Sequence, residues 1–375
     1  MRSLKLLLVF FFISFFNFKA FAQIPLSQKA NISLLTCGPG DELYSIFGHT
    51  AIRVQDPENN IDTVYNFGTF DFDTPNFYLK FVKGDLQYFV SVSSYKDFVY
   101  QYVYYNRDVF EQTLNLTHSQ KQQVSDELNT MLLTDKRFYT YKFIERNCTT
   151  MVADILNKHT VRISDKNSDT GKTHREILYS YLDEGHFYEN LGISLIFGSK
   201  TDDTISAPFL PIELMESVNN TKIANGPYAQ PILTINKQQK TDNGFSFWNS
   251  YYSYILAIAL LLIFSGKKIV YLSFLTISGL FGVVFCTVSS YSLHSELALN
   301  YNALLLNPFA LVLVYFLLTN NTKWIIRIIY SYLTLLALYT IIVITKPYFF
   351  SVLPLIVLIT TMLIRLLIKT GKTAL

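Results

Sequence analysis

The chain has 375 residues, of which 50% are hydrophobic and only 16% are charged, and its formal net charge at pH 7 is +3. This composition is too apolar for an average soluble protein, and the small charge without a basic run excludes nucleic acid as an expected partner. Membrane residence is the first inference, and the length allows two or three parts.

The first 22 residues have the pattern of a secretory signal peptide. A positive start, an apolar core at residues 6–16 and the small-residue site Ala20-Phe21-Ala22 follow in this order. The core is shorter than the roughly 20 apolar residues that a membrane-spanning helix needs. We therefore expect residues 1–22 to be removed; an uncleaved anchor is the alternative.

Residues 23–245 are mixed and polar enough to fold in water, and their patterns predict an α+β domain with an antiparallel sheet. Alternating or β-branched runs predict strands at 32–36, 49–54, 61–67, 86–92 and 109–116. The turn-forming residues 56–60 join the second and third of these into a hairpin. Helices are predicted at 94–105, 118–133 after the cap Thr117, 148–157 after the cap Asn147, and 173–183, while 76–83 is ambiguous.

The composition changes sharply near residue 246, and residues 246–375 are predicted to form an all-α transmembrane domain. Five apolar runs are each near the length that a bilayer requires: 248–265, 268–288, 303–319, 324–345 and 349–368. Most Lys and Arg between these runs fall on the side away from the exported domain, as the positive-inside rule requires. We expect a multi-pass protein of the inner (cytoplasmic) membrane whose first domain lies in the periplasm.

Cys148 is the strongest nucleophile candidate. It begins a predicted helix, whose unpaired N–H groups and dipole favour a thiolate, and Arg146 adds positive charge nearby. The same N–H groups can form an oxyanion hole for an acyl transition state. Two alternatives are a structural cysteine at the start of a buried helix and a disulfide between Cys37 and Cys148.

His49 is the strongest base candidate, because it opens a strand after Gly48, whose missing side chain lets other groups approach the imidazole. Asn66, on the next strand of the hairpin, can lie beside His49 and orient its ring, which would complete a Cys-His-Asn set. A turn-end asparagine without a catalytic role is the alternative. No histidines and carboxylates have metal-site spacing and no nucleotide motif is present, so we expect no metal or other cofactor.

Three runs carry a resemblance to a known family. These runs are CGPGDELYSIFGHTAIRV at residues 37–54, VYNFGTF at 64–70 and NCTT at 147–150. They resemble the Lnb N-terminal periplasmic domain family. That domain is similar to circularly permuted NlpC-type, papain-like enzymes, in which the histidine precedes the cysteine. Polar residues within 294–308 look like the family's periplasmic loop between the second and third membrane helices, so the resemblance covers nearly the whole mature chain. The third catalytic position, Asn66 or another polar group, stays open.

The resemblance implies a lipoprotein N-acyltransferase, which moves an acyl chain from a phospholipid to the α-amino group of a diacylglyceryl-cysteine lipoprotein. Cys148, deprotonated by His49, would hold the acyl chain as a thioester. A phospholipid donor and a diacylated lipoprotein acceptor are the expected partners. The substrate-binding candidates are Glu42, Tyr44, Ser45, Arg53, His294, Glu296, Asn300 and Asn302. A structural salt bridge is the alternative for Arg53, and a plain interfacial loop for His294 and Glu296.

Two other functions stay open from the sequence. A membrane-anchored, NlpC-like cell-wall endopeptidase or amidase would use the same Cys-His pair, although a peptidoglycan hydrolase needs one anchor rather than five helices. A non-catalytic membrane assembly protein would need Cys37 and Cys148 only as a structural disulfide.

Overall fold

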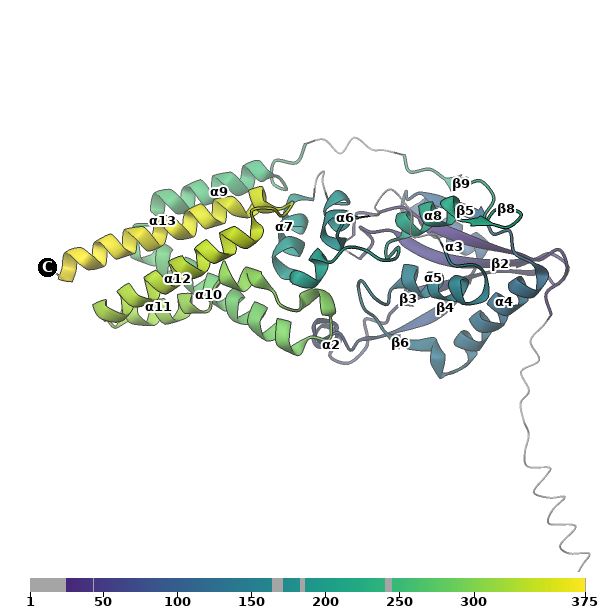
Figure 1. The fold of residues 1–375 in the computed structure, drawn as a ribbon, viewed down its shortest axis with the longest axis horizontal. Coiled ribbons are helices and arrows are strands. Elements are labelled where there is room, and N and C mark those ends of the chain that lie inside the picture. The colour runs from purple at the N-terminus through teal and green to yellow at the C-terminus, as the bar shows by residue number, and fades with distance from the viewer. Residues whose placement is uncertain (1–24, 43, 164–170, 183–185, 240–244, 375) are drawn as a thin grey trace, which may run out of the picture.

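The computed structural model describes residues 25–42, 44–163, 171–182, 186–239 and 245–374 (Figure 1). The predicted signal peptide, residues 1–22, lies outside these ranges. An α+β part with an antiparallel sheet and a bundle of apolar helices follow each other along the long axis of the molecule (Figure 1). The predicted fold class, α+β followed by apolar helices, is confirmed at this level.

A seven-stranded antiparallel sheet, in the order β6-β4-β3-β2-β1-β5-β9, forms the centre of the α+β part. Its strands are β1 Asn31–Cys37, β2 His49–Asp56, β3 Ile61–Thr69, β4 Gln87–Ser94, β5 Val109–Thr113, β6 Phe138–Thr140 and β9 Leu233–Asn236. The predicted hairpin is β2–β3, and its register pairs Ala51 with Asn66. The register of β1 and β2 pairs Cys37 with His49. A separate ribbon joins β7 (Lys222–Ile223) to β8 (Gly226–Pro227).

Helices cover both faces of this sheet. The face that includes Ile52 and Val54 packs into one core with α4 (His118–Leu133) and α5 (Cys148–His159). The opposite face packs Ala51 against α3 (Tyr95–Tyr104). Because side chains alternate along a strand, His49 and Arg53 share the α3 face of β2, whereas Thr50 faces α5.

The remaining helices of this part are α2 (Phe77–Lys83), α6 (His174–Ser180), α7 (Phe187–Ile196) and α8 (Pro211–Asn220). The ambiguous stretch 76–83 is therefore helical at α2, and the helix predicted over 173–183 is the shorter α6. Single turns of 3-10 helix are η1 (Asp135–Arg137), η2 (Ser199–Asp202), η3 (Ser295–Leu297) and η4 (Tyr301–Leu304).

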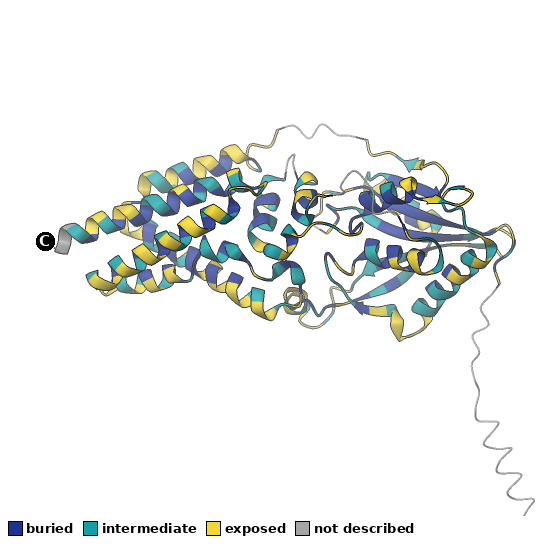
Figure 2. Cartoon of the chain, in the orientation of Figure 1, coloured by how far each residue is buried: buried dark blue, intermediate teal, exposed yellow. Residues whose placement is uncertain are grey.

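The apolar helices are α9 (Tyr251–Phe264), α10 (Lys268–Tyr291), α11 (Phe309–Leu318), α12 (Thr322–Val343) and α13 (Phe349–Ala374). Four described segments are long and apolar enough to cross a membrane: 268–291, 295–318, 322–343 and 349–371. The shorter α9 has 14 residues, or about 21 Å at 1.5 Å per residue, which is less than the roughly 30 Å of a hydrocarbon core. The expected count of five spans is thus one too many, because the Ser250 cap starts this helix late. Exposed positions cover the outer faces of the bundle (Figure 2).

Arg53 is held in a buried ion-pair network on the α3 face. Its Nε lies 2.7 Å from Oδ1 of Asp62, and its Nη1 lies 2.9 Å from Oε1 of Glu111. The guanidinium stacks 3.4 Å from the ring centroid of Tyr95, whose hydroxyl donates to Glu111. Arg53 therefore joins β2, β3, β5 and α3.

We predict that Arg53→Met lowers the free energy of unfolding by about 3–5 kcal/mol, because it leaves Glu111 buried without its cation. Urea denaturation of the full chain in detergent, followed by circular dichroism, measures the change. The control is Lys29→Met, which removes an exposed ion pair with Glu58 and should cost less than about 1 kcal/mol. Equal effects of the two substitutions would contradict the structural role of Arg53.

Candidate active site

Asn147 fixes the start of α5 and with it the position of Cys148. The Asn147 Oδ1 accepts hydrogen bonds from the backbone N–H groups of Thr149 (2.8 Å) and Thr150 (3.0 Å). In return, the Thr150 hydroxyl accepts one from the Asn147 N–H, which completes a capping box. The Asn147 Nδ2 also donates to two carbonyls of neighbouring loops. The predicted cap and helix start are confirmed.

The same cap limits which helix N–H groups can face a substrate. Asn147 takes the N–H groups of Thr149 and Thr150 through its side chain, and that of Met151 through its carbonyl. The sequence prediction of an oxyanion hole built from several of these groups is therefore too broad. At this helix start, the N–H of Cys148 itself is the group that can donate to a negatively charged substrate oxygen.

His49 and Asn66 meet Cys148 at the end of the sheet. The His49 imidazole lies near the Cys148 thiol and helps to lower its pKa. Its Nε2 lies 3.4 Å from the Asn66 Oδ1, and its ring stacks on Tyr102 at a centroid distance of 6.5 Å. The β2–β3 ladder stops at Ala51 and Asn66, so His49 lies just beyond its last pair.

The surroundings of Cys148 lower the pKa of its thiol and so favour the thiolate. Burial raises its pKa, but the charge and hydrogen bond of His49, the N–H of Thr50 and the hydroxyl of Thr149 outweigh burial and lower the pKa below its ordinary value. Thr50 and Thr149 also contact each other, with their hydroxyl oxygens 3.1 Å apart, and so hold α5 on β2.

Cys37 lies close to this thiol but has the opposite character. It is fully buried on β1, and burial raises the pKa of its thiol. Cys37, Cys148 and Cys286 are all free in the described part of the chain. The alternative of a Cys37–Cys148 disulfide is therefore wrong for this structure.

Two tyrosines near the thiol, the buried Tyr139 and the partly buried Tyr141, were not assigned to the site by the sequence analysis. Burial, followed by the charge of Cys148, raises the pKa of Tyr139 and Tyr141. The Tyr141 ring stacks on Tyr88 with centroids 4.5 Å apart. The clustering of Tyr and Phe in the sequence hints at such surroundings, but only the fold shows which rings gather near Cys148.

The candidates before the histidine form the turn that leads into β2. Glu42 and Tyr44 are exposed, Tyr44 by 72%. Ser45 is buried, and its hydroxyl donates to the carbonyl of Glu42. Ser45 thus shapes the turn, while Arg53 points into its ion-pair network rather than to the thiol.

Asn300 and Asn302 tie the loop before α11 to the end of α7. The amide of Asn300 donates to the carbonyls of residues 195 and 196, and the amide of Asn302 donates to the carbonyl of Ser194. The Tyr339 hydroxyl from α12 donates to the Asn302 Oδ1. These two amides join the α+β part to the membrane helices and are not brought to Cys148.

His294 and Glu296, in the same loop, are both buried. The His294 Nδ1 lies 3.1 Å from the Glu296 Oε1, and its Nε2 lies 2.9 Å from the carbonyl oxygen of Phe81 in α2. Within the described residues, the Glu296 Oε2 has no hydrogen-bond partner. The charge of Glu296 contributes to raising the pKa of Tyr141, after burial and Cys148, so this carboxylate lies on the Tyr141 side of the loop.

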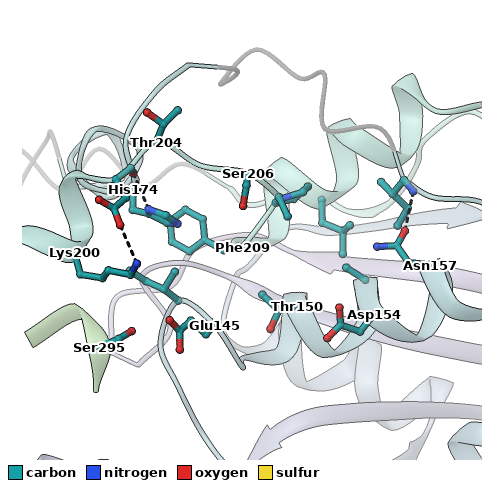
Figure 3. A pocket seen from close by; sticks show the side chains of 17 residues that line it. Glu145, Thr150, Asp154, Asn157, His174, Lys200, Thr204, Ser206, Phe209 and Ser295 are labelled. Carbon is teal, nitrogen blue, oxygen red and sulfur yellow. Dashed lines mark hydrogen bonds and ion pairs between the residues drawn. The ribbon is translucent and has the colours of Figure 1, made fainter. Parts of the chain in front are cut away.

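A pocket of about 440 Å³ lies along another face of α5. Figure 3 shows Thr150 and Asp154 of α5 on one side of it, with His174 and Phe209 opposite. Cys148 does not line this pocket. No group of three or more His, Cys, Asp or Glu among the described residues is placed to hold a metal ion.

The fold and the site define the class: a membrane protein whose α+β domain brings a cysteine, a histidine and an asparagine together at the end of its sheet. Residues 17–180 match the family model described as the Lnb N-terminal periplasmic domain. The part of the chain that contains these three residues is therefore similar to the Lnb N-terminal domain family, as the sequence motifs predict, and the match supports a periplasmic domain. A search of curated proteins and a search of solved structures found no match.

We predict that His49→Ala slows alkylation of Cys148 by iodoacetamide at pH 7 and moves the midpoint of its pH profile upward. Without the imidazole, burial remains and raises the pKa of the thiol. Mass spectrometry of the Cys148 peptide measures the rate, and His186→Ala is the control. An unchanged midpoint in His49→Ala would show that His49 does not set the thiolate population.

Proposed function

We propose that this protein is a lipoprotein N-acyltransferase with Cys148 as its nucleophile. The observation that carries the proposal is a thiol of lowered pKa beside His49, in a chain with four candidate membrane spans. A thiolate nucleophile suits acyl transfer, and the membrane spans suit substrates that are lipids. Similarity of the periplasmic domain to the Lnb N-terminal domain family supports the same activity.

In the first half-reaction, the Cys148 thiolate attacks an ester carbonyl carbon of a phospholipid. The carbonyl oxygen becomes negative, and the Cys148 N–H can donate to it. The ester C–O bond then breaks, His49 gives its proton to the departing oxygen, and the products are a lysophospholipid and an acyl-thioester on Cys148. With the His49 Nε2 directed to the Asn66 Oδ1, Nδ1 is the nitrogen left for this proton transfer.

In the second half-reaction, the neutral α-amino group of a diacylglyceryl-cysteine attacks the thioester carbon. His49 takes a proton from that nitrogen as the new amide bond forms. The C–S bond breaks and Cys148 leaves as a thiolate beside the imidazolium, which restores the starting pair. The buried tyrosines limit the access of water, which would otherwise hydrolyse the thioester.

The proposal includes a circularly permuted papain-like arrangement, in which residues 23–245 form the catalytic domain and 246–375 the transmembrane domain in the inner membrane. The chain order of His49, Asn66 and Cys148 supports the permutation. A cell-wall endopeptidase or amidase could use the same three groups, but its substrate would not require a bundle of apolar helices packed against the domain through Asn300 and Asn302.

The decisive test is mass spectrometry of a lipoprotein N-terminus from cells that depend on this protein for N-acylation. We expect Cys148→Ser to leave the lipoprotein diacylated, and Cys286→Ser, on the exposed side of α10, to leave N-acylation intact. Full N-acylation in Cys148→Ser cells would overturn the thioester mechanism.

A further inference from the structure

Helix α2 exposes apolar side chains on the surface of the described part of the chain. None of its seven residues is buried, and Tyr78 and Leu79 are 76% and 72% exposed. Phe72, in the loop before the helix, is 63% exposed. Lys80 and Lys83 lie in the last turn of the same helix. Apolar side chains beside lysines on a short surface helix are typical of an element that lies in a bilayer interface.

The end of α10 holds α2 at the level where the chain leaves the membrane. Ser292 directly follows α10, and its hydroxyl donates to the carbonyl of Val82 at 2.7 Å. The N–H of Leu293 donates to the carbonyl of Lys83, also at 2.7 Å. With 24 residues, α10 is about 36 Å long, enough to cross the hydrocarbon core. Its last residues lie beside α2, at the end of the bundle that faces the α+β part (Figure 1). A bilayer spanned by α10 would therefore have α2 at its outer boundary.

Gly84 makes this close approach possible. It follows α2 with φ of 75°, and a Cβ at this position would lie 2.9 Å from the imidazole and 3.0 Å from the backbone nitrogen of His294. The His294 Nε2 donates a second hydrogen bond, 2.9 Å long, to the carbonyl oxygen of Phe81. The position of α2 against the membrane loop is therefore fixed through its backbone carbonyls, which accept from the Ser292 hydroxyl, the Leu293 N–H and the His294 imidazole.

A row of aromatic rings leads from this surface towards the thiol. The Phe72 ring lies 4.9 Å from both Phe70 and Phe77, measured between centroids. The Phe70 ring lies 5.2 Å from Tyr88, which stacks on Tyr141 at 4.5 Å. Tyr141 and Cys148 are both partly buried against the same core cluster, and the charge of Cys148 helps to raise the pKa of Tyr141. The row thus joins an exposed apolar surface at the bilayer boundary to the surroundings of Cys148.

We propose that Phe72 and α2 insert into the outer leaflet and that a phospholipid acyl chain reaches Cys148 along this aromatic row. The occupant is a bilayer phospholipid, with the lysines of α2 near its phosphate. Insertion of α2 stands on the exposed surface and the contacts with α10, whereas the role of the row rests on the proposed acyltransferase function.

The test of insertion is quenching of a single tryptophan by brominated phosphatidylcholine in proteoliposomes. The two native tryptophans, Trp248 and Trp324, are replaced by Phe, and Leu79→Trp is added. The control adds Glu58→Trp instead, in the exposed β2–β3 turn. This turn lies at the opposite end of the sheet from His49, where the neighbouring Asn59 donates to the carbonyl of residue 25. We expect at least threefold stronger quenching for Leu79→Trp. Equal quenching in the two proteins would overturn the insertion of α2.

The test of the route is acyl loading of Cys148 from phospholipid vesicles, read by mass spectrometry of the intact protein. We expect Tyr78→Glu combined with Leu79→Glu to lower loading at least tenfold, and Leu133→Glu, on exposed α4, to leave it unchanged. Unreduced loading in the double variant would overturn the route. If the native chain showed no acyl loading of Cys148, the proposed function would be contradicted. The quenching experiment would still decide whether α2 inserts.

Discussion

The four hydrogen bonds of the Asn147 side chain are the interaction on which the site depends. Its oxygen accepts hydrogen bonds from two N–H groups of α5, and its nitrogen donates to carbonyls of two surrounding loops. The cap therefore acts in two directions, setting both the first residue of the helix and the place of that residue in the domain. Cys148 is that first residue, so the position of the proposed nucleophile is set by the hydrogen bonds of the helix cap.

The end of an antiparallel sheet is the other requirement. The side chains of His49 and Thr50 point to opposite faces of β2, yet His49 influences the Cys148 thiol and the Thr50 hydroxyl contacts Thr149, the next residue of α5. This is possible because pairing of β2 with β3 ceases at Ala51, so a helix start can approach from one face and still reach an imidazole on the other. In the middle of the sheet, the backbone of the neighbouring strand would separate the two groups.

The sequence allowed the central strands, the hairpin and both long-helix caps of the α+β part to be predicted, because alternation, turn residues and cap residues are local features. Strands β6 and β9 could not be predicted, since each is short and forms only by pairing at an edge of the sheet. The pair Cys148 and His49 was predictable from residue type and motif. The roles of Asn300 and Asn302 were not, because a polar loop residue that binds substrate and one that binds the end of α7 look alike in sequence. The surplus fifth span has a similar origin: hydropathy does not reveal where Ser250 begins a helix.

The burial of Cys37 has a consequence for the lifetime of the protein in an oxidising compartment. Thiol–disulfide exchange proceeds through the thiolate, and burial keeps Cys37 protonated and away from solvent oxidants. Its partner in register is His49, so a reactive thiol at that position would stand next to the very groups that activate Cys148. An inert Cys37 leaves Cys148 as a free thiol, and the β1 strand thereby protects the redox state of the candidate site although it contributes no group to the proposed reaction.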